Sequence, residues 1–155
     1  MVVTKRIAAN TTVGGGYLLR AEDGEFENRT IQQISFSKKY SGFRMAHRVM
    51  TDQTFAKNSK PELRLRYRIS SEIPLEGLSL DVKEFYLKIN NEYLNSWQSD
   101  DYDMEIRGVA LLGYSISQAN DLEIGIDYRL NSFINGDPRN RIWLSINIFH
   151  SLGHK

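Results

Sequence analysis

Apolar and polar residues alternate one by one along most of this chain, and this alternation limits the possible folds more than any other feature. Successive side chains of a strand point to opposite faces, so a period of two is typical of a strand with one apolar and one polar face. Such segments recur about eight times. The clearest cover residues 63–70, 104–116, 122–130 and 142–148, followed by 43–49 and 85–93, and then by 6–20 and 29–37. The sequence therefore predicts an all-β fold.

The polar links between these segments indicate how the strands are joined. Short links rich in turn residues fall near residues 39–42, 74–77 and 118–121. Longer polar links cover residues 22–28, 56–61, 95–103 and 131–140. Their alternation is typical of an antiparallel up-and-down meander with short turns at one rim and long loops at the other. A change of parity near residues 83–84 indicates a β-bulge.

A meander of amphipathic strands has exposed edges, and closure into a barrel removes them. We therefore predict a single β-barrel domain, residues 1–155, with about eight strands. Alternation alone does not say which face is inside. In a transmembrane β-barrel the apolar stripe faces lipid, whereas in a soluble lipocalin-like β-barrel it faces an apolar ligand in the cavity. No apolar run approaches the ~20 residues that a membrane-spanning helix needs.

Three features favour the transmembrane β-barrel. Aromatic residues lie near the ends of apolar stripes, as in the aromatic belts of outer-membrane barrels. These residues are Tyr17, Phe43, Phe85, Tyr93, Tyr114 and Tyr128. The polar stripes are rich in arginine on some strands and in acids on others, which suits an interior filled by ion pairs. Few residues are left over for a helical lid, which many soluble ligand-binding barrels have.

The net charge and the composition argue against several kinds of function. Twenty basic and nineteen acidic side chains give a formal charge of +1, so we expect no nucleic-acid partner. The chain has no cysteine, which excludes disulfides and thiolate metal sites. Its first residues do not lead into the apolar core of a signal peptide. A cell outer membrane location therefore implies that the signal peptide has been removed.

An arginine ladder at Arg64, Arg66 and Arg68 is the most conspicuous candidate site. Guanidinium groups bind carboxylates in a bidentate manner, so we predict an ion-pair network in the barrel lumen. Its predicted members are Arg64, Arg66, Arg68, Glu72, Glu92, Glu105, Arg107, Glu123, Asp127 and Arg129. The alternative is a constriction that selects anions in a small outer-membrane channel. We expect no catalytic, cofactor or metal site, and hence no enzyme.

Several segments also resemble the DUF2490 family. They are His47-Arg48, residues 63–68 with Ile73-Pro74-Leu75, residues 91–95, Gly113-Tyr114 and residues 122–125. The resemblance extends over roughly residues 29 to 150. It implies an outer-membrane barrel of Gram-negative bacteria, common in Bacteroidota, with no established activity. A larger parent barrel is an alternative that it leaves open.

Together these patterns predict an outer-membrane β-barrel protein without enzymatic activity, acting as a structural or partner-binding subunit. Its expected partners are outer-membrane lipid and other outer-membrane proteins that contact the long loops.

Overall fold

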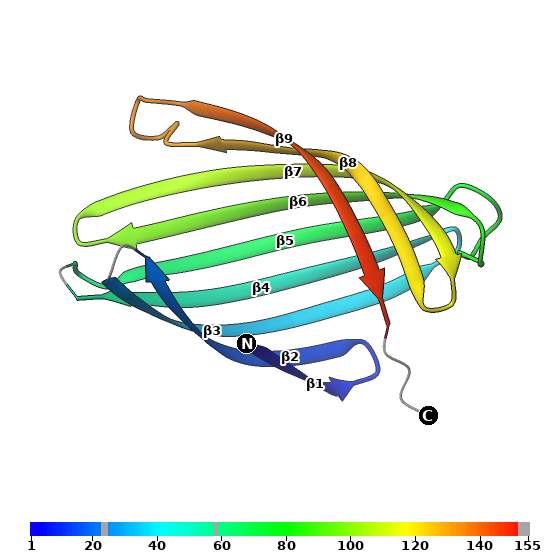
Figure 1. The fold of residues 1–155 in the computed structure, drawn as a ribbon, viewed down its shortest axis with the longest axis horizontal. Helices are drawn as coiled ribbons and strands as arrows, with labels where there is room; N and C mark the ends of the chain where they lie inside the picture. Colours follow the sequence, from blue (N-terminus) through cyan, green and yellow to red (C-terminus); the bar gives the residue numbers. More distant parts are fainter. Residues whose placement is uncertain (23–24, 58, 152–155) are drawn as a thin grey trace.

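The computed structural model describes residues 1–22, 25–57 and 59–151, which form one antiparallel sheet (Figure 1). Its nine strands follow one another in sequence order, each hydrogen-bonded to the next. They are β1 (Val2–Ala8), β2 (Thr11–Glu22), β3 (Glu25–Tyr40), β4 (Phe43–Ala56), β5 (Glu62–Pro74), β6 (Phe85–Gln98), β7 (Asp101–Ser117), β8 (Asn120–Asn131) and β9 (Arg139–His150). The predicted all-β, up-and-down antiparallel fold is confirmed.

The prediction of about eight strands was wrong because residues 6–20 contain a turn. β1 and β2 form a hairpin across Ala9 and Asn10, in which Val3 lies opposite Gly15 and Thr4 opposite Gly14. Three consecutive glycines in β2 have no side chains, so the alternation that identifies strands is lost there. The hairpin therefore had no clear signal in the sequence.

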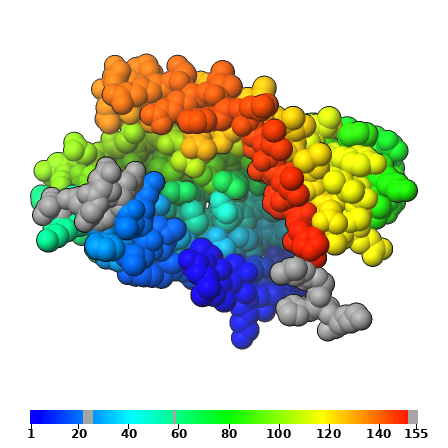
Figure 2. Space-filling view, viewed as in Figure 1, coloured from blue at the N-terminus to red at the C-terminus, as the bar shows by residue number. Residues whose placement is uncertain are grey.

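We also predicted that the sheet closes into a barrel. This prediction was wrong, because the sheet is open. β1 pairs only with β2 and β9 only with β8 among the residues that the structure describes. The sheet is nevertheless strongly curled, with β9 and the β1–β2 hairpin at its two edges (Figure 1). Figure 2 shows a hollow between these edges, through which the middle strands are visible.

The links do not separate into a short-turn rim and a long-loop rim. Residues 99–100 connect β6 and β7 where a longer loop was predicted, and residues 75–84 form a long link where a tight turn was predicted. The long link predicted at residues 22–28 includes residues 23–24, which lie outside the described residues. The predicted bulge at residues 83–84 falls in this link, before β6 begins at Phe85. Lys83 has a positive φ of 71° and donates its N–H to the carbonyl of Ser115 over 2.6 Å, while Ser115 donates to the carbonyl of Glu84 over 3.0 Å. Two residues therefore lie opposite one, and the predicted bulge is present.

The two faces of the curled sheet have opposite chemistry. Charged side chains point into the hollow, and the largest fully buried side chains in the described part of the chain are those of Asp52, Glu92 and Glu123. Branched aliphatic and aromatic side chains of the same strands point outward and are exposed. We call these surfaces the concave and the convex face. The polarity of an ordinary water-soluble sheet, with an apolar core and a charged surface, is reversed.

No helix in the described residues is long and apolar enough to cross a membrane.

Candidate functional site

The charged concave face is the candidate site, and its first cluster surrounds Asp52 of β4. Arg64 of β5 lies directly opposite Asp52 and donates from Nε to Oδ1 over 2.5 Å. Nε of Arg66 approaches Oδ2 to 3.3 Å, and Nε of Arg29 lies 3.9 Å from Oδ1. Arg29 and Arg64 also both donate to the hydroxyl of Thr54. Asp52 is 1% exposed, so these arginines replace the water that its charge has lost.

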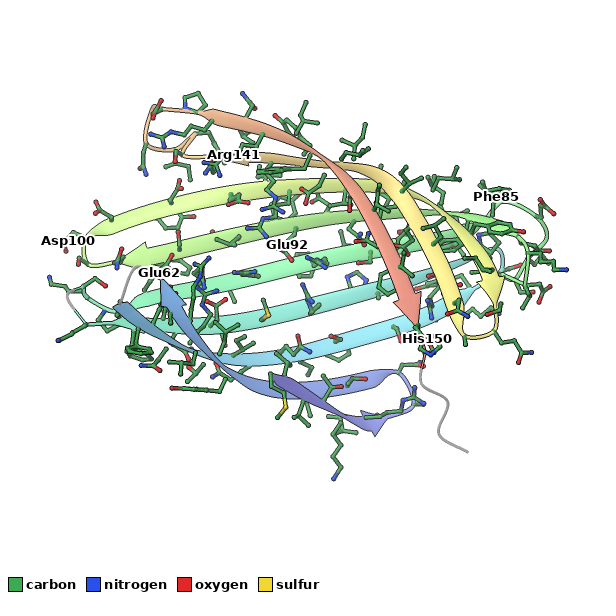
Figure 3. All side chains as sticks on the ribbon, viewed as in Figure 1. Glu62, Phe85, Glu92, Asp100, Arg141 and His150 are labelled. Atoms are coloured by element: carbon green, nitrogen blue, oxygen red, sulfur yellow. The ribbon has the colours of Figure 1, made fainter. Side chains whose placement is uncertain are left out.

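The second cluster surrounds Glu92 at the middle of β6, which is labelled in Figure 3. Arg48 of β4 and Arg68 of β5 both donate to Oε2, over 3.1 Å and 2.8 Å. Arg107 of β7 reaches Oε1 over 3.5 Å and also pairs with Glu105, two residues before it on the same face. One buried carboxylate therefore joins arginines from three strands.

The third cluster surrounds Glu123 of β8. Tyr86 of β6 donates its hydroxyl to Oε1 over 2.9 Å, and Lys88 donates its ammonium to the same oxygen over 2.7 Å. β7 lies between these strands, with Gly113 opposite both Tyr86 and Glu123. Because Gly113 has no side chain, the ring of Tyr86 lies across β7 and reaches the carboxylate. A Cβ at position 113 would overlap that ring.

All ten residues of the predicted lumen network lie on the concave face, but they do not form one network. Arg68, Glu92, Glu105 and Arg107 meet in the Glu92 cluster. Arg64 and Arg66 pair with Asp52. Glu72 pairs with Arg44, Glu123 with Lys88, and Asp127 with Arg129 on the same strand.

Sequence reasoning missed Asp52, Arg48, Lys88 and Tyr86 as members of these clusters. Asp52 was missed because the strand around it was predicted to end at residue 49, whereas β4 continues to Ala56. Extending the alternation of Arg44 and Arg48 by further steps of two residues reaches Asp52. Tyr86 carried no comparable signal, because its role depends on a glycine in the neighbouring strand.

The arrangement of charged groups on the concave face has two chemical consequences. Buried carboxylates hold arginines and a lysine from neighbouring strands, which fixes how the strands pair. The guanidinium groups also supply planar donors that bind oxyanions.

The family model described as "Protein of unknown function (DUF2490)" matches residues 1–153. The chain belongs to the DUF2490 family. The match includes β1 and β2, which lie outside the range of residues 29 to 150 over which the resemblance was seen in the sequence. Neither curated proteins nor solved structures gave a match.

Asp52→Asn tests the first cluster. We expect it to destabilise the protein by ~3–5 kcal/mol, because Arg64 and Arg66 lose the charge that compensates them. The measurement is the free energy of unfolding in urea. Asp137→Asn is the control, since its pair with Arg139 is mostly exposed and contributes at most about 1 kcal/mol. Equal unfolding free energies for the two variants would contradict this role of Asp52.

Gly113→Ala tests the contact between Tyr86 and β7. The added methyl group forces the tyrosine ring away from Glu123, and overpacking of this kind costs ~1–3 kcal/mol. Gly108→Ala is a control in the same strand, because nothing lies within 4 Å of a Cβ built there. We expect a lower urea midpoint for Gly113→Ala alone. A parent-like midpoint for Gly113→Ala would show that the glycine is not needed for this contact.

Proposed function

We propose that this protein is an outer-membrane β-barrel protein of a Gram-negative bacterium, with its convex face toward lipid and its concave face toward the barrel interior. It acts as a structural or partner-binding subunit and not as an enzyme. Outer-membrane lipid is its first partner, and other outer-membrane proteins bind through its loops.

The reversed polarity of the two faces carries this proposal. On β9 the side chains of Ile142, Leu144, Ile146 and Ile148 are 72%, 72%, 61% and 77% exposed, whereas Glu92 is 1% exposed. Leaving such side chains in water forfeits ~1.5–3 kcal/mol each, and a lipid environment restores that contribution. The soluble lipocalin-like alternative requires the apolar stripe to line the cavity. The arrangement of the two faces therefore favours the membrane.

Aromatic side chains on the convex face support the same proposal. Tyr40 stacks on Phe43, and Phe85 packs against Tyr114, each pair with ring centroids 4.8 Å apart. Both pairs lie beside links at one rim. Trp97 and Tyr102, with centroids 5.5 Å apart, flank the link at residues 99–100 at the opposite rim. Aromatic rings at both rims match the two interfacial belts of a membrane barrel.

The same proposal requires closure of the sheet. Unpaired backbone groups are unfavourable in hydrocarbon, so the free edges of β1 and β9 need partners there. In a meander of nine strands, β1 and β9 run in the same direction. Their direct pairing would be parallel, whereas an odd number of further strands, as in a larger parent barrel, would keep every pair antiparallel.

The small-channel alternative is less well supported. Arg64, Arg66 and Arg68, the predicted constriction, are each engaged by a buried carboxylate, Asp52 or Glu92. Such engaged side chains fill the interior and stabilise it. We therefore propose a structural role for them.

Membrane extraction tests the location. We expect the protein to sediment with outer membranes of the native bacterium, to resist alkaline carbonate and to need detergent for release. A folded barrel should also migrate differently in unboiled and boiled gel samples. Recovery of a folded monomer from the cytosol without detergent would end the proposal.

Ile146→Arg tests which face meets lipid. A cation on the lipid face near the bilayer midplane costs ~2–4 kcal/mol in such barrels, so folding into lipid vesicles should decrease. Asn147→Arg is the matched control, because Asn147 is the next residue, points to the concave face and lies opposite Glu123. The folded fraction in vesicles is read from the unboiled gel. Similar folding of both variants would show that Ile146 does not face lipid.

A further inference from the structure

The strand register places an unusual row of arginines across the concave face. From β4 to β9 the directly opposed residues are Arg48, Arg68, Glu92, Arg107, Arg129 and Arg141. The row therefore contains five arginines and one acid. We call it the arginine row.

Three pairs in the arginine row place like charges directly opposite each other, which destabilises a sheet. They are Arg48 with Arg68, Arg107 with Arg129, and Arg129 with Arg141. In the first pair both guanidinium groups donate to Oε2 of Glu92. In the second pair Glu105 lies beside Arg107 and Asp127 beside Arg129, whereas no carboxylate of the described residues pairs with Arg141. Opposed like charges in a sheet whose other residues pair favourably are typical of a functional site.

The charges of the row do not balance. Arg48, Arg68 and Arg107 share two carboxylates, Glu92 and Glu105, which leaves one positive charge. Arg129 is neutralised by Asp127, to which it donates from Nε and Nη2 over 3.1 Å and 2.8 Å. Arg141 makes no ion pair within residues 1–22, 25–57 and 59–151, which leaves a second positive charge.

The unbalanced end of the row is accessible. Arg141 is exposed, and the side chain of Arg129 is 37% exposed. Figure 3 shows Arg141 on β9, at the edge of the sheet, with Glu92 on the middle strands. An oxyanion entering the hollow therefore reaches Arg129 and Arg141 without displacing a buried side chain.

We propose that the arginine row binds a phosphate group between Arg129 and Arg141, which it bridges as Glu92 bridges Arg48 and Arg68. At this place Arg141 supplies the unbalanced charge, and phosphate oxygens accept from its guanidinium and from the N–H groups of Arg129 that do not bind Asp127. This inference concerns the concave face alone and does not depend on where the convex face lies.

Calorimetric titration with inorganic phosphate tests the site, using the full chain folded in neutral detergent at constant ionic strength. We expect saturable binding to the parent. Arg141→Gln should weaken it by at least about tenfold, because a hydrogen bond between charged groups is lost. Since Arg141 is exposed and makes no ion pair in the described structure, the urea midpoint of this variant should equal that of the parent.

Arg139→Gln is the matched control. Arg139 lies two residues away on the same face of β9 and is paired with Asp137, and its replacement changes the net charge by the same amount. We expect it to keep phosphate affinity within about twofold. Absence of saturable binding to the parent, or equal weakening by both variants, would overturn the proposal.

A second titration separates two sources of the phosphate group. Dihexanoyl phosphatidic acid carries the same group on a short lipid. Much tighter binding of this lipid than of inorganic phosphate, lost in Arg141→Gln, assigns the site to a lipid headgroup. Equal or weaker binding assigns it to free phosphate. Binding of the lipid that is insensitive to Arg141→Gln, with no binding of inorganic phosphate, counts against the site.

Discussion

The enclosure of carboxylates by cationic side chains on the concave face is the interaction on which the rest of the structure depends. A charge withdrawn from water is tolerated only when opposite charges and hydrogen bonds take the place of the water. Asp52, Glu92 and Glu123 each have cationic partners from other strands, although both donors to Glu123 bind Oε1 and its Oε2 has no partner among the described residues. A slip of one residue in any of these strands would move its charges to the convex face. The ion pairs therefore fix the register as well as the polarity of the sheet.

The strands and their two faces could be predicted from the sequence where side chains alternate clearly. Residues 63–70 show this best, because the three arginines of β5 all lie on the concave face as their spacing requires. The β1–β2 hairpin could not be predicted, since the glycines of β2 carry no side chains to alternate. The link at residues 75–84 was misread because its apolar residues continue a strand-like pattern outside any strand.

The residues that lie on the concave face could be predicted more easily than the pairs that they form there. Alternation assigns a residue to a face, but the residue opposite it depends on the register of two strands. The arginine row illustrates this, because Arg107, Arg129 and Arg141 lie 22 and 12 residues apart in the chain and become neighbours only through two hairpins. Repulsion between opposed arginines is therefore visible in the structure and not in the sequence.

Curvature explains why glycines accompany these large charged side chains. Side chains on the inner face of a curled sheet converge, so some positions must be empty for others to be filled. Gly113 leaves room for the ring of Tyr86, and a Cβ at Gly125 would overlap the backbone of β7. Both glycines flank Glu123, whose two donors come from the strand beyond β7. The missing side chain at Gly113 of β7 thus allows the ring of Tyr86 on β6 to reach a carboxylate two strands away.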